Sequence, residues 1–335
     1  EVKRDLVELN ELVLPLCEDL GCGVISCGTH PFSTWTEQQT TDDERYKQLV
    51  DRVQWPAQRL MIFGLHVHVG MDSAEKAVAV FNQLSNYIPQ FLALSASSPF
   101  WQGNDTGLAS VRTKVFETLP TAGLPEQLVN WGEFQTFMNT LIAARAIESI
   151  REVWWDIRPH PGFGTVELRM CDGVATMGEL LAIAAFMHCA VVWLSEEYEN
   201  GHLPPPFRHW ILRENKWRAS RWGLEADLIC DNEGNLAKNA HLIRQMMEDF
   251  IPLSERLNCQ EELMSITDIL DQGPSYLRQR KVHEQSGQLE SVVEKLRTVS
   301  RCLTRLQSRG LSDHDFTKCY QEVVVIAKTL RSVQG

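Results

Sequence analysis

Two histidines stand two residues apart in a short segment of alternating polar and apolar residues, Gly64-Leu65-His66-Val67-His68-Val69-Gly70. This period-two pattern predicts a β-strand in which the leucine and valines point to one face and both imidazoles to the other. Imidazole is a metal ligand in mixed sites, so His66 and His68 could serve one Zn²⁺, Mn²⁺ or Mg²⁺ site. The same spacing also fits two hydrogen-bonded histidines at a sheet edge.

A second segment, Thr165-Val166-Glu167-Leu168-Arg169-Met170, alternates in the same way. Its apolar residues are expected to face a core, with Glu167 and Arg169 on the opposite face. A carboxylate beside a guanidinium suits a metal–phosphate site, because the carboxylate can hold the cation while the arginine donates two hydrogen bonds to phosphate oxygens. The alternative is a surface ion pair worth roughly 0–1 kcal/mol. The two strands together predict the walls of one charged site.

A further arginine, Arg112, lies in a long segment with little periodicity. Residues 97–131 are rich in Gly, Pro and Ser, which predicts an irregular loop, and loops of this length are usually functional or disordered. The aromatic residues in this segment argue against disorder. A mobile loop carrying Arg112 could close over a polyphosphate and exclude water, or the arginine could hold a surface loop in place.

The segment 213–223 is basic and rich in tryptophan inside an otherwise acidic chain. Helical spacing could place Lys216 or Arg218 beside Trp222 as a cation–π or anion-binding face. The alternative is a solvated helix face with buried tryptophan stems.

Most of the other elements are predicted to be helical. Apolar residues at helical spacing predict a helix over 2–20, and residues 24–27 resemble a short strand. Three capping pairs, each with an acidic residue three positions after a polar one, predict helix starts. They are Asp72 with Glu75, whose helix runs to Pro89, Asn130 with Glu133, and Thr176 with Glu179, whose apolar helix to about Tyr198 is expected to be central.

Turn residues predict how the Glu167 strand is paired. Residues 153–158 alternate as a strand, and residues 159–164 are Pro- and Gly-rich, so an antiparallel hairpin is expected there. Beyond the three prolines at 204–206 the chain is expected to be overwhelmingly helical, with Ser312 and Asp315 capping the last helix. The predicted fold class is α+β, with a modest sheet packed by many helices.

Composition excludes several classes of function. The chain has 335 residues, 44% of them hydrophobic, and a formal net charge of −12, which argues against nucleic-acid and anionic-membrane partners. No apolar run approaches the roughly 20 residues that span a bilayer. The nine cysteines form no C-x-x-C pair and are typical of reduced thiols in the cytoplasm. No P-loop, Rossmann or G-x-S-x-G motif occurs.

These segments resemble the glutamate–cysteine ligase 2 family, a group of carboxylate–amine ligases related in fold to glutamine synthetase. The resemblance spans most of residues 20–225 with its motifs in the right order. The matching runs are Gly28-Thr29-His30-Pro31-Phe32, Phe63-Gly64-Leu65-His66-Val67-His68-Val69-Gly70, Leu94-Ser95-Ala96-Ser97-Ser98-Pro99-Phe100, Trp155-Asp156-Ile157-Arg158-Pro159 and Gly164-Thr165-Val166-Glu167-Leu168-Arg169.

The resemblance implies a curved, mostly antiparallel sheet that forms a funnel-like active site for ATP and divalent cations, Mg²⁺ or Mn²⁺. It assigns candidate roles to nine residues. The implied metal ligands are His66 and Glu167, the ATP contacts are His68, Arg112, Arg169 and Arg221, the catalytic residues are Glu167 and Arg169, and the amino-acid pocket contains Thr29, His30 and Arg158.

One family feature has no counterpart in this sequence. The family carries an N-terminal strand of the form G-[IV]-E-x-E that supplies further metal ligands, and one histidine with one glutamate cannot hold two cations. Because the chain begins in a helix without an initiator methionine, we expect this strand on a segment upstream of Glu1. A single catalytic domain is expected over 1–335, with its sheet in about 20–225 and a helical part in about 235–335.

The leading hypothesis is a cytoplasmic, ATP-dependent ligase that joins glutamate or a similar carboxylate to cysteine or another amine. Family habit implies a homodimer, with no nucleic-acid or membrane partner. One alternative is a zinc-dependent metallohydrolase, in which the His-x-His strand holds the metal that activates water. The other is a catalytically inactive ligase homologue that works as a binding protein.

Overall fold

A three-stranded antiparallel sheet lies at the centre of the protein. The computed structural model describes residues 2–39, 42–203 and 205–307. The sheet has the order β1-β5-β4 and stays open at both edges. Its strands are β1 (Gly64–Gly70), β4 (Ile157–His160) and β5 (Thr165–Asp172). The predicted α+β class with an antiparallel sheet is confirmed.

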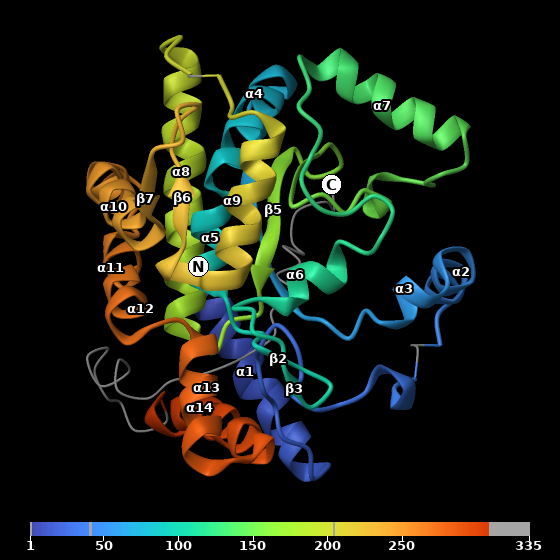
Figure 1. Cartoon of the computed structure of the whole chain (residues 1–335), viewed down its shortest axis with the longest axis vertical. Helices are drawn as coiled ribbons and strands as arrows, with labels where there is room; N and C mark the ends of the chain where they lie inside the picture. Colours follow the sequence, from blue (N-terminus) through green and yellow to red (C-terminus); the bar gives the residue numbers. More distant parts are fainter. Residues whose placement is uncertain (1, 40–41, 204, 308–335) are drawn as a thin grey trace.

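Strands β4 and β5 form the predicted hairpin, which turns at residues 161–164 (Figure 1). Gly164 has φ +63°, a conformation that glycine adopts without a steric penalty. The strand starts later than expected, at Ile157 rather than Val153. The reason is that the backbone N–H groups of Trp154 and Asp156 donate to the carbonyls of Thr121 and Gly123 instead of entering the sheet.

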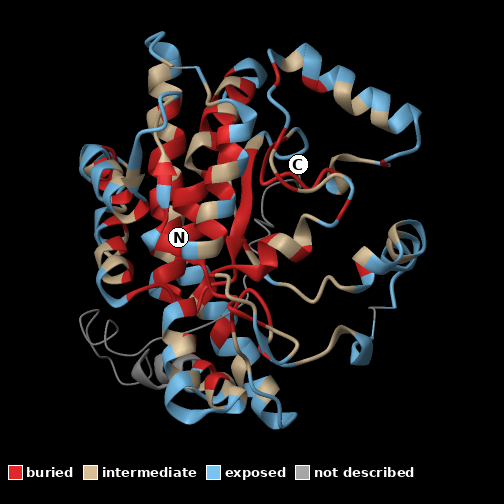
Figure 2. Ribbon diagram, in the orientation of Figure 1, coloured by how far each residue is buried: buried red, intermediate tan, exposed pale blue. Residues whose placement is uncertain are grey.

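Helices cover the apolar face of the sheet. Helices α4 (Ala74–Leu84), α5 (Ile88–Ser95) and α8 (Met177–Glu199) pack against the three strands and form the main core. Figure 2 shows the buried residues concentrated in α5, α8 and β5. Helix α8 is central and apolar, as predicted. Among the described residues it alone is long and apolar enough to cross a membrane, and its burial is that of a core helix.

The capping pairs give two correct helix starts and one start that is shifted. Thr176 caps α8 and Asn130 caps α7 (Trp131–Ala143), each through a side-chain oxygen that accepts an N–H bond. The helix expected from Asp72 instead begins after Ser73, whose hydroxyl accepts from the N–H of Lys76. Asp72 pairs with the Lys76 ammonium at 2.7 Å. The predicted run to Pro89 is divided by a 3-10 turn, η2 (Ser85–Tyr87).

The N-terminal region contains the predicted first helix but not the predicted first strand. Helix α1 spans Val2–Asp19. Residues 24–27 form no strand, so this prediction is wrong. The N–H of the next residue, Gly28, donates to Ser97 Oγ at 2.8 Å. Three short helices precede β1, namely η1 (Trp35–Glu37), α2 (Glu44–Val53) and α3 (Trp55–Gln58).

The segment 97–131 is more ordered than its composition predicted. It contains a small hairpin and one helix: β2 (Phe100–Trp101), β3 (Asn104–Asp105) and α6 (Val111–Phe116). The hydroxyl of Ser110 caps α6 by accepting from the N–H of Thr113. Arg112 is therefore a buried helical residue, and the expectation of a mobile loop around it is wrong.

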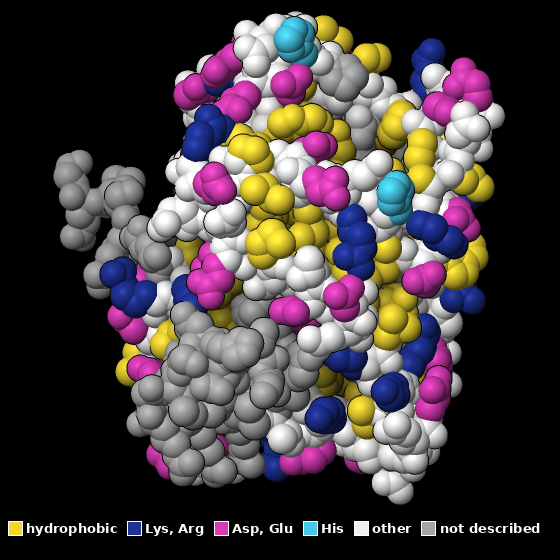
Figure 3. All heavy atoms as spheres, turned by 90° about the vertical axis from the view of Figure 1, so that its left-hand side faces the viewer, with side chains coloured by type: hydrophobic (Ala, Val, Ile, Leu, Met, Phe, Trp, Pro, Cys, Tyr) yellow, Lys and Arg dark blue, Asp and Glu magenta, His cyan; other side chains and the backbone are white. Residues whose placement is uncertain are grey.

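The remainder is mostly helical, as predicted, apart from one small hairpin. Figure 3 shows acidic and basic side chains intermixed on the face that includes α10–α12.

The expected cap at Ser312 and Asp315 lies outside the described residues. In chain order the elements are η3 (Ile150–Glu152), α9 (His209–Trp222), η4 (Gly223–Glu225), β6 (Asp227–Ile229), β7 (Leu236–Lys238), α10 (Asn239–Arg256), α11 (Gln260–Met264), α12 (Ile266–Gln272), α13 (Ser275–Ser286) and α14 (Leu289–Gln307).

Candidate functional site

The sheet brings the two alternating motifs together. His68 of β1 lies directly opposite Glu167 of β5, and on the other side of β5 Arg158 of β4 is also paired with Glu167. Directly paired residues project their side chains to the same face of a sheet. Three charged or polar side chains from three strands therefore form one row, with Glu167 in the middle. The two motifs predicted that His68 and Glu167 lie close together, and the β4–β5 hairpin adds Arg158.

The carboxylate of Glu167 is buried and has cationic or imidazole groups at both oxygens. Arg158 Nε donates to Oε2 at 2.7 Å, and Arg169 donates to Oε1. The side chain of Glu167 is only 3% exposed, so this is not the surface ion pair of the alternative interpretation. Water screens these charges little, so each contact is much stronger than a surface pair.

Electrostatics keep Glu167 ionised. Burial raises the pKa of Glu167, but the hydrogen bond from His68 and the charges of Arg169 and Arg158 outweigh it and hold the pKa well below its usual range. Burial, together with the charge of Arg169, lowers the pKa of Arg158 to about 10, so it remains a cation at neutral pH. One carboxylate beside two guanidinium groups leaves an excess of positive charge that can attract an anion.

His66 lies beside the same carboxylate at an irregular point of the sheet. Its Nδ1 is 3.7 Å from Glu167 Oε1, and Nε2 of His68 is 3.5 Å from the same oxygen. The register shifts between Leu65 and Val67, a distortion of the kind that re-aims side chains next to functional sites. Burial and the charges of Arg169 and Arg112 lower the pKa of His66 well below 6.5, so the imidazole is neutral at pH 7.

His66 and Glu167 would suit a cation that takes its other ligands from water and substrate. Within residues 2–39, 42–203 and 205–307, no cluster of three or more His, Cys, Asp or Glu side chains is arranged to hold a metal ion. His66 and Glu167 would therefore supply two ligands at most. Mg²⁺ commonly binds through one or two carboxylates plus substrate phosphates and water, whereas a structural or catalytic Zn²⁺ site needs three or four protein ligands.

Arg112 is buried and binds the backbone of β5 next to Glu167. It is 3% exposed, and its two Nη atoms donate to the carbonyls of Met170 at 3.2 Å and Arg169 at 3.3 Å. Burial lowers the pKa of Arg112. Among the described residues, Nε of Arg112 and Nε of Arg169 have no hydrogen-bond partner. Buried N–H groups are nearly always paired, so these two donors mark a place where an anion or water is expected.

Gly64 is the position where the sheet admits the Arg112 guanidinium. A Cβ at Gly64 would lie 2.2 Å from Nη2 of Arg112. We expect Gly64→Ala to displace this guanidinium and to lower the free energy of unfolding by about 1–3 kcal/mol, as overpacking does. Gly70→Ala is the matched control, because a Cβ at the other end of β1 meets nothing within 4 Å. Urea denaturation of both variants checks this, and equal stabilities would contradict it.

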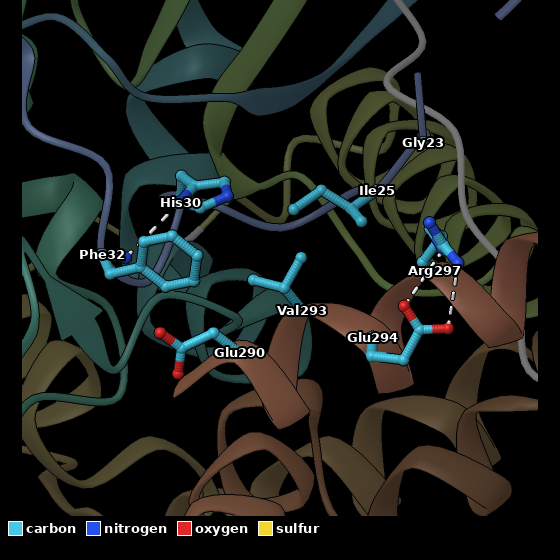
Figure 4. A pocket seen from close by; sticks show the side chains of 8 residues that line it. All are labelled: Gly23, Ile25, His30, Phe32, Glu290, Val293, Glu294 and Arg297. Carbon is cyan, nitrogen blue, oxygen red and sulfur yellow. Dashed lines mark hydrogen bonds and ion pairs between the residues drawn. The ribbon is translucent and has the colours of Figure 1, made fainter. Parts of the chain in front are cut away.

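No described hydrogen bond or ion pair joins the candidate substrate residues Thr29 and His30 to Glu167. Thr29 is buried, and its hydroxyl donates to the carbonyl of Phe100 at 2.8 Å. Nδ1 of His30 accepts from the N–H of Ser33, and burial lowers the pKa of His30. His30 and Phe32 line a hollow of about 370 Å³ between residues 23–32 and α14. Figure 4 shows the two side chains next to each other. A role for either residue in amino-acid binding stays a prediction.

The other two arginines of the expected set have contrasting positions. Arg158, expected in the amino-acid pocket, donates to Glu167 and also to the carbonyls of Ile150 and Val153. Arg221 donates to the carbonyl of Gly107 and lies 5.6 Å from the ring of its neighbour Trp222. No described hydrogen bond or ion pair joins Arg221 to Glu167, so its contact with ATP stays a prediction.

Lys216 has a structural role that the sequence pattern did not reveal. It was expected beside Trp222, but its ammonium is buried and lies 2.5 Å from Asp156 Oδ2 and 2.6 Å from Glu117 Oε1. Burial lowers the pKa of Lys216, but Asp156 and Glu117 outweigh it and raise the pKa overall. Helical spacing from Leu212, which is also buried, could have placed Lys216 on the inner face of α9.

Another buried carboxylate, Asp172 at the end of β5, orders the backbone around Arg112. Its oxygens accept from the N–H of Ser97 at 2.9 Å, the hydroxyl of Ser98 at 2.6 Å and the hydroxyl of Ser110 at 2.8 Å. Ser98 Oγ in turn accepts from the N–H of Arg112. These serines belong to a segment whose sequence shows no periodicity, so only the three-dimensional structure reveals their function.

The fold and the site together define a class of α+β protein in which an open antiparallel sheet, backed by helices, carries a carboxylate among guanidinium and imidazole groups. Residues 1–295 match the model of the glutamate–cysteine ligase family 2, GCS2. The chain belongs to this family, which confirms the resemblance of its motifs.

Relatives and a solved structure agree with this assignment. A protein from Frankia alni, named "Putative glutamate–cysteine ligase 2-1", is 50% identical over 297 residues, which are 88% of this chain and 78% of the relative. A "Putative glutamate–cysteine ligase 2" from Thermobifida fusca is 44% identical over 88% of this chain and 74% of its own. A crystal structure of glutamate–cysteine ligase from Francisella tularensis in complex with AMP has a TM-score of 0.62 at 11% identity, covering 89% of this chain and 76% of that one. At that identity the likeness shows the fold.

Proposed function

We propose that the protein is an ATP-dependent carboxylate–amine ligase that joins the γ-carboxylate of glutamate, or a similar acid, to cysteine or another amine. The observation that carries the proposal is the buried Glu167 carboxylate, held between Arg158 and Arg169 and faced by two imidazoles. Membership of the glutamate–cysteine ligase family 2 and the AMP bound to the Francisella neighbour support it.

The residues divide into a cation-binding pair and a phosphate-binding pair. Glu167 and neutral His66 would hold Mg²⁺ or Mn²⁺, and the bound cation would neutralise charge on the phosphate oxygens of ATP. His68 and Arg169 would contact those phosphates, since both lie within hydrogen-bond or ion-pair reach of Glu167. Arg112 donates to the carbonyls of the consecutive residues Arg169 and Met170, so we assign it to positioning β5.

The reaction would proceed in two transfers. A carboxylate oxygen of the acid attacks the γ-phosphorus of ATP, and the bond to the leaving ADP breaks, which gives an acyl phosphate. The amine then attacks the acyl carbon, phosphate leaves with the bonding electron pair, and the amine loses a proton. Transfers of this kind depend mainly on positioning and charge stabilisation, which is what the cationic groups around Glu167 could provide.

An assay of ADP release tests the proposal. Purified protein is incubated with ATP, Mg²⁺, glutamate and a panel of amines, with hydroxylamine added in parallel to capture an acyl phosphate as a hydroxamate. We expect ADP formation that requires the acid, and a hydroxamate that appears only with ATP. Stoichiometric zinc with ATP-independent hydrolysis would favour the metallohydrolase instead. Nucleotide binding without turnover across the panel would favour a binding protein. Cytoplasmic location and a homodimer stay predictions.

A further inference from the structure

The tip of the β4–β5 hairpin carries a pair of stacked rings. The ring centroids of His160 and Phe163 are 4.3 Å apart, and their planes differ by 13°. His68 of β1 meets both rings edge-on, at 5.7 Å from His160 and 5.4 Å from Phe163. The cluster therefore joins the hairpin tip to the strand that carries the candidate phosphate contact.

Phe163 leaves most of its surface open to solvent. Its side chain is 64% exposed, although a single exposed aromatic residue is in itself ordinary. What distinguishes Phe163 is that the turn and the rings fix its orientation. The N–H of Phe163 donates to the carbonyl of His160 at 3.1 Å, and Gly164 follows at φ +63°. An aromatic ring that is already oriented loses little conformational entropy when a flat ligand stacks on it.

The ring pair lies one row away from Glu167 on the same face of the sheet. Thr165 is paired with His160, just as Glu167 is paired with Arg158, and Nδ1 of His68 is 2.9 Å from Thr165 Oγ1. Two residues along a strand span about 7 Å. A ligand whose phosphates reach Glu167 and Arg169 could thus extend along β5 toward the hairpin tip.

The chemistry of the ring pair favours a neutral, flat ligand group. Burial and the charge of Arg158 lower the pKa of His160, so this imidazole is an uncharged aromatic ring at pH 7. Nucleobases stack on such rings because each base has its own π-face.

We propose that Phe163, supported by His160, is the stacking platform for the purine base of the nucleotide whose phosphates bind at Glu167 and Arg169. This inference rests on the proposed ligase function and adds the position of the base to it. The ribose and α-phosphate would then lie along Thr165 and His68.

Calorimetric titration with two ligands tests the platform. MgATP carries the base, whereas magnesium tripolyphosphate has the phosphates alone. We expect Phe163→Ala to weaken MgATP binding by at least about fivefold, the lower end for one stacked base, and to leave tripolyphosphate binding unchanged. Trp210→Ala is the matched control, because Trp210 is also an exposed aromatic residue, 60% exposed on α9, and should change neither affinity.

A second variant gives a spectroscopic measurement. Phe163→Trp should keep the affinity for MgATP, and MgATP but not tripolyphosphate should change the added tryptophan fluorescence relative to wild type. Unchanged MgATP affinity in Phe163→Ala would overturn the platform while leaving the ligase proposal intact. An equal loss of affinity for MgATP and tripolyphosphate would also overturn it, because Phe163 would then affect phosphate binding and not the base. If the wild type bound neither ligand, the platform and the nucleotide-dependent function would fall together.

Discussion

Glu167→Gln is expected to abolish acid-dependent ADP release, with a loss of at least about 10²–10³-fold, comparable to the removal of one preorganised electrostatic contact in an active site. The amide keeps the shape of the side chain but not its charge. Arg158 and Arg169 would then face each other in a buried site without a counter-ion. Removing one partner of a buried ion pair typically lowers the free energy of unfolding by about 3–5 kcal/mol.

A control variant makes the same Glu-to-Gln change at an exposed ion pair. Glu196→Gln removes a carboxylate that pairs with Arg256 at 2.5 Å, but there both side chains are largely exposed. A surface pair contributes roughly 0–1 kcal/mol, so Glu196→Gln should leave activity and stability near wild type. Activity is measured where urea denaturation shows each variant fully folded. Normal ADP release from folded Glu167→Gln would contradict the assigned role.

The part of the site that the sequence predicted depends on strand geometry. Alternation along 64–70 and 165–170 places His66, His68, Glu167 and Arg169 on polar faces, because successive residues of a strand point to opposite sides. The Pro- and Gly-rich turn predicted the β4–β5 hairpin, and hence the neighbourhood of Arg158 and Glu167. These are local signals, and local signals are readable from a single sequence.

The part that the sequence did not predict depends on contacts between distant segments. Arg112 donates to carbonyls 57 and 58 residues further along the chain, and Lys216 pairs with Asp156 at a separation of 60 residues. No periodicity encodes such pairs. The helix start at Ser73 was missed for a different reason. Asp72 and Ser73 are both good capping residues, so the sequence allowed either one. The Asp72 carboxylate pairs with the Lys76 ammonium, and Ser73 is the residue that caps the helix.

Lys216→Met should produce the second large effect, this time on stability. Lys216 joins three elements: it extends from α9 to Asp156, just before β4, and to Glu117 at the end of α6. The carbonyl of Asp156 also accepts from the N–H of Arg169 at 2.7 Å, so the cluster supports the candidate site. Without the ammonium, two carboxylates would face each other around a buried position. We expect a loss of about 3–5 kcal/mol in the free energy of unfolding at neutral pH.

The pH dependence of this loss gives a sharper test. Burial already raises the pKa of Asp156, and removing Lys216 removes the strongest influence that lowers it. In the variant, the folded state would bind a proton at Asp156 that the unfolded state releases, so acid stabilises the folded state relative to the unfolded one. The stability difference between wild type and Lys216→Met should therefore narrow as the pH falls from neutral toward the raised pKa of Asp156.

Two further variants decide whether the buried charge is the cause. Lys114 contacts the same Glu117 at 2.9 Å but is partly exposed, so Lys114→Met should cost no more than about 1 kcal/mol. Adding Asp156→Asn to Lys216→Met should recover stability, with a coupling energy on the order of 1–3 kcal/mol in a double-mutant cycle. Urea denaturation measures each free energy. A pH-independent loss without coupling would show instead that Lys216 stabilises α9 through the packing of its aliphatic stem.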